Sequence, residues 1–255
     1  MENFKKPFQV ALFTSLIVLN VLILLSLTST PEATSSAKEL PLPQATLSQG
    51  HKNFLPIIRK IGSLVYVQSS TSYLEGSESE ILHIVGEVFN NTGKTIHNVT
   101  IMASLFGTGS STEIATLQGQ PLAGVIPPGQ SACFNLHIAK PTNYNSYSLG
   151  LPTYQQYTGM LPNLALANVS GGFDEDNDWY YLSGMVRNPS GTLLDNARVV
   201  GTLYNRTNFV VGCDQTYASF PEENPFADGS FDLYYLDRLY SDVASYKLQV
   251  VGTAP

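Results

Sequence analysis

Charge is scarce in this sequence, because Asp, Glu, Lys and Arg make up only 13% of its 255 residues. Soluble globular proteins average about 25%. The remaining balance is mildly acidic, with 20 acidic against 13 basic residues and a formal net charge of −7. Nucleic-acid binding needs a basic surface, so this composition argues against a nucleic-acid partner.

Cysteine is also scarce, since the chain has only Cys133 and Cys213. Two cysteines cannot build a disulfide framework or a four-cysteine zinc site. A single disulfide between them is one interpretation, because an exported chain meets oxidising conditions. Two buried thiols are the alternative, since sequence alone does not place two Cα atoms within bonding range.

Motifs of common enzymes are missing as well. The sequence has no Gly-x-Ser-x-Gly elbow, no phosphate-binding glycine loop, no His-Glu-x-x-His and no dinucleotide fingerprint. We therefore expect no enzyme and no cofactor, with calcium, treated below, as the one cofactor that the sequence suggests.

The N-terminus carries a membrane signal. Residues 8–28 are uncharged and largely apolar, and about 20 such residues span a bilayer as a helix. Lys5 and Lys6 precede them, which predicts a cytoplasmic N-terminus at 1–7 and an exported remainder. We expect a signal anchor at 8–28, or alternatively a cleaved signal peptide that would leave the protein secreted. Residues 29–60 are rich in Ser, Thr and Pro and predict a disordered spacer.

The rest of the chain contains an internal repeat. A Gly-x-Val-x-Asn-x-x-Gly pattern occurs at 86–93 and again at 184–191, 98 positions later. Further matches relate Asn98 to Asn196 and Leu105 to Leu203 at that offset, Tyr147 to Tyr246 at an offset of 99, and Gly129 to Gly229. Such self-similarity indicates tandem duplication, with copies at 61–159 and 160–255.

Each copy reads as short strands separated by turns. The first predicts strands at 64–67, 81–89, 99–106, 132–138 and 147–151. Residues 81–89 alternate between apolar and polar, which is typical of a strand with one buried face. The predicted fold is all-β, with two tandem immunoglobulin-like antiparallel β-sandwiches after a single N-terminal transmembrane helix or signal segment.

A family resemblance lies in the second copy. The run Gly201-Thr-Leu203-Tyr204-Asn205, followed by Phe209-Val-Val-Gly212, resembles the FxLYD domain, whose pattern is aromatic-x-Leu-Tyr-Asp. The resemblance implies small immunoglobulin-like sandwiches in secreted or membrane-tethered prokaryotic proteins of the cell envelope. It implies a fold and not an activity.

One acidic cluster suggests a metal. Asp174, Asp176 and Asp178 alternate within five residues, and calcium prefers several hard oxygen ligands from one short loop. Trp179 and Met185 stand where an EF-hand would have its glycine and its distal glutamate. A solvated connection between two strands is therefore the alternative to a calcium site.

Three aromatic residues are candidates for ligand binding. Trp179, the only tryptophan, follows the acidic cluster and could stack on a sugar ring. Tyr154 and Tyr157 fall in the connection between the copies. The alternative is a packing role, in the core for Trp179 and between the two copies for the tyrosines.

Together these observations predict a non-catalytic protein, anchored in the membrane or secreted, that displays two β-sandwiches for adhesion, scaffolding or protein binding. A carbohydrate-binding module and an accessory subunit of a membrane complex are the alternatives. Besides the membrane itself, the expected partner is an envelope protein or a polysaccharide. The sequence does not determine the oligomeric state.

Overall fold

The computed structural model describes residues 64–76, 80–191, 194, 196–221, 224, 226–238 and 240–253. The predicted anchor at 8–28 and the spacer at 29–60 lie outside the described residues. Within the described ranges no helix is long and apolar enough to cross a membrane. The regular elements there are all strands, which confirms the all-β prediction.

The first half of the fold, up to Gln156, contains strands β1 to β8, and the second half, from Ala165, contains β9 to β14. In chain order they are β1 (Val65–Glu75), β2 (Ile81–Asn90), β3 (Ile96–Gly107), β4 (Glu113–Gly119), β5 (Val125–Ile126), β6 (Ser131–Ala139), β7 (Tyr144–Leu149), β8 (Thr153–Gln156), β9 (Ala165–Asp174), β10 (Trp179–Arg187), β11 (Asn196–Asn205), β12 (Val210–Tyr217), β13 (Gly229–Tyr235) and β14 (Val243–Thr253).

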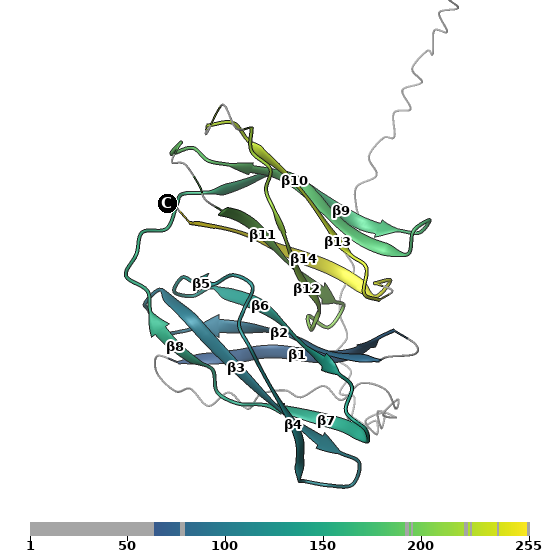
Figure 1. Ribbon diagram of the computed structural model, residues 1–255. Coiled ribbons are helices and arrows are strands. Elements are labelled where there is room, and N and C mark those ends of the chain that lie inside the picture. The colour runs from purple at the N-terminus through teal and green to yellow at the C-terminus, as the bar shows by residue number, and fades with distance from the viewer. Residues whose placement is uncertain are drawn as a thin grey trace, which may run out of the picture. The chain divides into compact units, whose positions relative to one another are not determined.

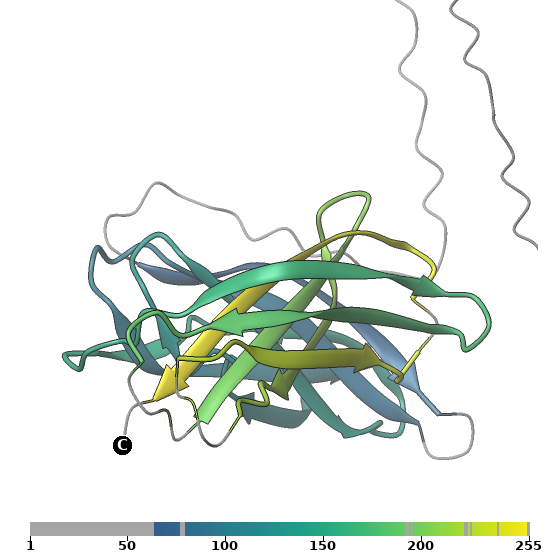
Figure 2. The same cartoon turned by 90° about the horizontal axis from the view of Figure 1, so that it is seen from above.

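The strands form antiparallel sheets that lie in four layers (Figure 1). The first half has a β1-β2-β6 sheet and a sheet around β3, which pairs with β4, β5, β7 and β8. The second half has a β9-β10-β13 sheet and a β12-β11-β14 sheet. The inner layers are β1-β2-β6 and β12-β11-β14, so the two halves meet sheet against sheet. Figure 2 shows the stack from above, with the second half nearest the viewer.

The two halves repeat the same topology once β5 and β8 are set aside. In each half the first, second and fifth of the six equivalent strands form one sheet, and the fourth, third and sixth form the other. The registers agree with the sequence repeat, because Leu105 pairs with Tyr147 and Leu203 pairs with Tyr246. One match is wrong: Gly129 has φ of 69° in a turn, whereas Gly229 lies in β13 opposite Val186.

The first glycine of the repeated pattern makes room for an aromatic ring. Gly86 pairs with Phe134, and Gly184 pairs with Phe231 in the second half. A Cβ atom on Gly86 would lie 2.5 Å from the Phe134 ring and 2.6 Å from the Ser69 carbonyl oxygen. The Phe ring therefore occupies the space that a side chain on this glycine would need.

Replacing Gly86 with Ala is expected to destabilise the protein by about 2 kcal/mol, because the added methyl group overpacks the core against a backbone atom. Urea denaturation of the full chain in detergent measures this change. Gly124→Ala is the control, because a Cβ there meets no atom within 4 Å. An equal stability of both variants would contradict the packing role of Gly86.

The asparagine of the repeated pattern organises a turn. Asn90 is fully buried; its Oδ1 accepts hydrogen bonds from the backbone N–H and hydroxyl of Thr92, and its Nδ2 donates to the carbonyl oxygens of Lys94 and Ile126. The last glycine, Gly93, has φ of 71°, a value that favours glycine. In the first half, the asparagine and the last glycine of the pattern therefore have a structural role in this turn.

The alternation at 81–89 predicts a strand with one buried face and one solvated face. In the structure the polar face is buried as well, since Glu87 is 5% and His83 is 7% exposed. The second half covers this face of β2, so both faces of β2 are buried. The expected strands are present with different bounds, and β8 lies in the segment read as a plain connection.

Candidate functional site

The junction between the two inner sheets is the candidate functional site, because polar and titratable groups gather there. A disulfide joins Cys133 of β6 to Cys213 of β12, with their Cα atoms 5.8 Å apart. The two cysteines are 0% and 3% exposed and belong to the largest core cluster, which also includes Val200 of β11. This core therefore continues from the first half into the second.

A buried carboxylate lies beside this disulfide, on the same face of the sheet. Glu87, opposite Cys133 in the register, accepts hydrogen bonds from the Ser131 and Tyr204 hydroxyls and pairs with Lys247 Nζ at 2.9 Å. Lys247 also donates to the carbonyl oxygen and the hydroxyl of Ser131. The group links β2 and β6 of one half to β11 and β14 of the other.

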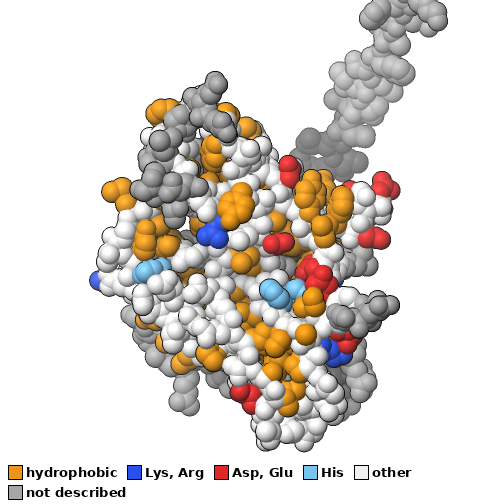
Figure 3. Space-filling view, in the orientation of Figure 1, with side chains coloured by type: hydrophobic (Ala, Val, Ile, Leu, Met, Phe, Trp, Pro, Cys, Tyr) orange, Lys and Arg blue, Asp and Glu red, His pale blue; other side chains and the backbone are white. Residues whose placement is uncertain are grey.

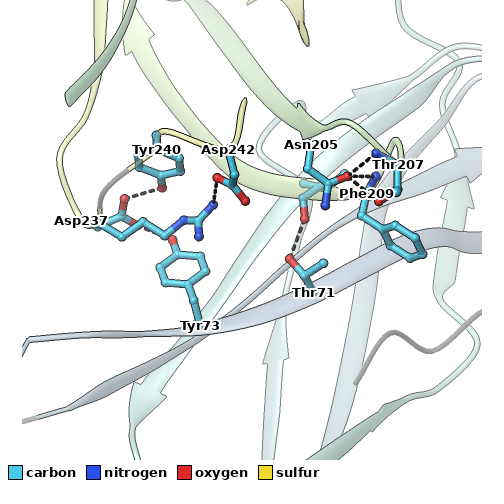
Figure 4. A network of polar contacts seen from close by, with 10 residues as sticks. Thr71, Tyr73, Asn205, Thr207, Phe209, Asp237, Tyr240 and Asp242 are labelled. Carbon is cyan, nitrogen blue, oxygen red and sulfur yellow. Dashed lines mark hydrogen bonds and ion pairs between the residues drawn. The ribbon is translucent and has the colours of Figure 1, made fainter. Parts of the chain in front are cut away.

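A second polar network crosses the junction farther along β1 (Figure 4). The hydroxyls of Tyr73 and Tyr240 both donate to the Asp237 carboxylate. The Arg238 guanidinium lies over both rings, 5.2 Å from the Tyr73 centroid and 4.7 Å from the Tyr240 centroid, and pairs with Asp242. Tyr73 comes from the first half and the others from the second.

His83 extends this network into the first half. Its ring stacks on Tyr73 with centroids 4.8 Å apart, and its nitrogens contact Glu75 Oε2 at 2.8 Å and Asn135 Oδ1 at 3.0 Å. Nearby, Thr71 donates its hydroxyl hydrogen to the Val210 carbonyl oxygen at 2.6 Å, as Figure 4 also shows. The junction thus combines an apolar centre with hydrogen bonds on either side.

The junction tyrosines remain protonated at neutral pH. Burial, and then the adjacent Glu87 carboxylate, raise the pKa of Tyr204 above its usual value. Burial, followed by the Asp237 charge, does the same to the pKa of Tyr73. For Tyr240 burial, and then Tyr73 and Asp237, raise the pKa. These hydroxyls therefore act as hydrogen-bond donors to carboxylates, and those of Tyr73 and Tyr204 do so across the junction.

The Asp174 cluster forms the β9–β10 hairpin turn. Asp174 Oδ1 accepts the backbone N–H groups of Asp176 and Asn177, and its Oδ2 accepts from the Asn177 amide and from Trp179 Nε1. The side-chain hydrogen bond from Asn177 is the main reason that the pKa of Asp174 is lowered. Within the described ranges no three His, Cys, Asp or Glu side chains are grouped to hold a metal. Calcium binding by Asp174, Asp176 and Asp178 stays a prediction.

The predicted ligand-binding aromatics fall in two separate places. Trp179 begins β10, on the outer sheet of the second half, and its ring lies 5.5 Å from that of Tyr234 on β13. Tyr154 lies in β8 of the first half and is 40% exposed. Tyr157 follows β8, packs edge-on against His97, and donates its hydroxyl hydrogen to the Met160 carbonyl oxygen.

Sequence reasoning missed the junction network, because each of its residues looks ordinary in its own strand. The one sequence signal was the cysteine pair, which does not occupy equivalent positions in the two copies. The face seen in Figure 3 carries few charged side chains, in keeping with the low charge of the chain.

No family model matches the chain, and no curated protein matches it. One solved structure that matches the chain is titled "Crystal structure of red sea bream transglutaminase", with 12% sequence identity and a TM-score of 0.22. The match covers 72% of this chain but only 29% of that chain, so the chain spans less than a third of the protein it matches. A TM-score of this size supports no conclusion about fold or activity.

Proposed function

We propose that this protein is a non-catalytic component of the cell envelope that presents two joined, immunoglobulin-like β-sandwich units for protein binding, adhesion or scaffolding. The observation that supports it best is the junction, where a disulfide and buried hydrogen bonds fix one half against the other. A fixed pair of units presents a larger continuous surface than two units on a free linker. Disulfides persist in oxidising compartments, which fits an exported location.

The resemblance to FxLYD domains supports the same proposal. Leu203 is fully buried, and Asn205 Oδ1 accepts hydrogen bonds from the Thr207 backbone N–H and hydroxyl and from the Phe209 N–H (Figure 4). An aspartate at 205 would offer the same acceptor oxygen. Gly201 replaces the aromatic residue of the pattern, and a Cβ there would lie 2.2 Å from the Tyr235 hydroxyl. The motif residues thus have structural roles.

Purification of the full chain from its native membrane in mild detergent, with mass spectrometry of co-purifying proteins, tests the proposal. We expect an intact N-terminal peptide and an envelope protein in stoichiometric amount. Replacing residues 8–28 with an unrelated span should leave this partner bound. Loss of the partner on that replacement would favour an accessory subunit, and a chain that begins near Lys38 would show that the segment is cleaved. Absence of any partner would contradict protein binding.

Carbohydrate binding is the second candidate function, and the outer face of the β9-β10-β13 sheet supports it. Tyr181 pairs with Tyr234 across the strands, and Trp179 lies two residues from Tyr181 on the same face, with Asp174 beside its indole nitrogen. Aromatic rings next to hydrogen-bonding groups are suited to sugar rings.

If this face binds a polysaccharide, Trp179→Ala should weaken the binding about tenfold, as expected for the loss of roughly 1.4 kcal/mol of stacking. Quenching of the single tryptophan of the full chain by envelope polysaccharide provides the first measurement. Affinity electrophoresis then compares the variants, with Tyr217→Ala as control because Tyr217 is 64% exposed on another sheet. Unchanged binding by Trp179→Ala would exclude this face.

A further inference from the structure

A cavity of about 630 Å³ lies between the two halves, on the side where the chain passes from β8 to β9. Gly124 and Val125 contribute to it from the first half, β11 and β14 line it from the second, and Leu161 and Pro162 border it from the connection. Its volume is within the range of about 300–1,000 Å³ that is typical of ligand sites. Neither polar network described above reaches it.

Two residues that line this cavity carry a hydrogen-bond acceptor without a partner. Asn196 and Gln249 both line it, and their side-chain oxygens, Oδ1 and Oε1, are buried and accept no hydrogen bond from the part of the chain that the structure describes. Buried polar atoms are nearly always hydrogen-bonded, so an unpaired pair in one cavity indicates a ligand that brings donors. Gln249 pairs with Val200 on β11, four residues beyond Asn196. The two positions are thus offset by about 13 Å along the strands, which an elongated ligand with several donors would match.

The charge of the cavity favours an anionic group on the ligand. Among the described residues that line it none is Asp or Glu, although the chain is acidic overall, and Arg198 lies on its wall. Arg198 Nη1 donates to Gln215 Oε1, which leaves other guanidinium N–H groups for a ligand. Guanidinium groups bind carboxylates with matched, paired hydrogen bonds.

The apolar part of the wall is aliphatic. It comes from valine, leucine and proline side chains, and no Phe, Tyr or Trp is among the described lining residues. Sugars are commonly bound by stacking on aromatic rings, whereas aliphatic walls suit aliphatic side chains.

We infer that this cavity binds a short extended peptide with aliphatic side chains and a free C-terminal carboxylate. The carboxylate pairs with Arg198, and peptide N–H groups donate to Asn196 and Gln249. This inference rests on the proposed protein-binding function and names its ligand class and its site.

The test is equilibrium dialysis of the full chain in detergent against a pool of N-acetylated pentapeptides. Their positions are degenerate for Ala, Val, Leu and Ile, and their carboxylate is free. Mass spectrometry quantifies the retained peptides. We expect saturable retention, about tenfold weaker for the same pool with a C-terminal amide and about tenfold weaker for Arg198→Gln. Arg187→Gln is the matched control, since Arg187 pairs with Asp228 outside the cavity.

A second variant blocks the cavity without removing a polar contact. A Cβ on Gly124 meets no atom within 4 Å and its φ is not positive, so Gly124→Trp adds bulk at the wall and should reduce retention at least tenfold. Gly150→Trp is its control, because Gly150 lies outside the cavity and its nearest neighbour is 3.8 Å away. Circular dichroism checks that both variants fold.

Several results would overturn the inference: no retained peptide, equal retention by Gly124→Trp, or equal retention of the amidated pool. Retention of neutral oligosaccharides in place of peptides, lost in Gly124→Trp, would overturn it in favour of a glycan. A chain that keeps a native protein partner but retains no peptide would refute this site and leave the proposed function standing. A chain with neither would refute both.

Discussion

Replacing both Cys133 and Cys213 with Ala is expected to lower the free energy of unfolding by about 4.5 kcal/mol, because the disulfide closes a long loop. The bonded residues are 80 positions apart, so the unfolded chain loses much conformational freedom when they are linked. Both residues are buried, and Ala fills part of the space without adding a polar group. Urea denaturation of the full chain in detergent, followed by circular dichroism, gives the change.

The reduced wild-type chain is the control for this prediction. A reductant should lower the midpoint of the wild type toward that of the double variant and leave the variant unchanged. If the oxidised wild type and the variant unfold at the same urea concentration, the disulfide contributes nothing to joining the halves.

Lys247→Met is expected to cost about 3 kcal/mol, because it leaves the Glu87 carboxylate buried without its cation. The Glu87 side chain is only 7% exposed, so water cannot replace the lost partner. The hydroxyls of Ser131 and Tyr204 still donate to it but carry no charge. Urea denaturation measures the loss of stability. Because the ion pair joins the two halves, its removal should destabilise both halves.

A double-mutant cycle separates this pair from simple packing. Adding Glu87→Gln to Lys247→Met should restore part of the stability, since the unpaired charge is then gone. Lys140→Met is the matched control: the Lys140 side chain has the same 31% exposure as that of Lys247, but its partner Glu80 is 39% exposed. We expect the control to cost less than about 1 kcal/mol. Equal losses at both lysines would show that the buried pair has no special role.

Much of the fold could be predicted from periodicity and repetition. The alternation at 81–89 is a local property of the chain, and it correctly placed β2 in an antiparallel sheet. The repeat related Leu105 to Leu203, and the structure gives both residues equivalent partners. Short or exposed strands such as β8 escaped prediction, because four exposed residues leave no apolar pattern to detect.

The junction could not be predicted in the same way. Glu87 lies at a polar position of an alternating strand, where a solvated side chain is the usual outcome. It is buried because another sheet, formed by residues more than a hundred positions later, covers it. The unpaired acceptors of Asn196 and Gln249 depend on the same packing. Local patterns carry no information about which faces of two folded units come together.

The junction also joins unlike faces of the two repeats. The first half contributes its β1-β2-β6 sheet, whereas the second contributes β12-β11-β14, which corresponds to the β4-β3-β7 sheet of the first. Such a head-to-tail contact is heterologous, and it leaves the β4-β3-β7 sheet and the β9-β10-β13 sheet on the outside. By geometry alone, a further copy of the repeat could pack on either outer sheet through the same kind of contact.

The residues at those two ends lack the groups that hold the junction. By register, Ser230 and Thr116 occupy the places of Cys133 and Cys213, while Met185 and Ser148 occupy those of Glu87 and Lys247. The disulfide and the ion pair thus occur on the two sheets that face each other, and other residues take the equivalent positions on the two outer sheets. At these register positions the outer sheets have neither the thiols nor the ion pair that join the inner sheets.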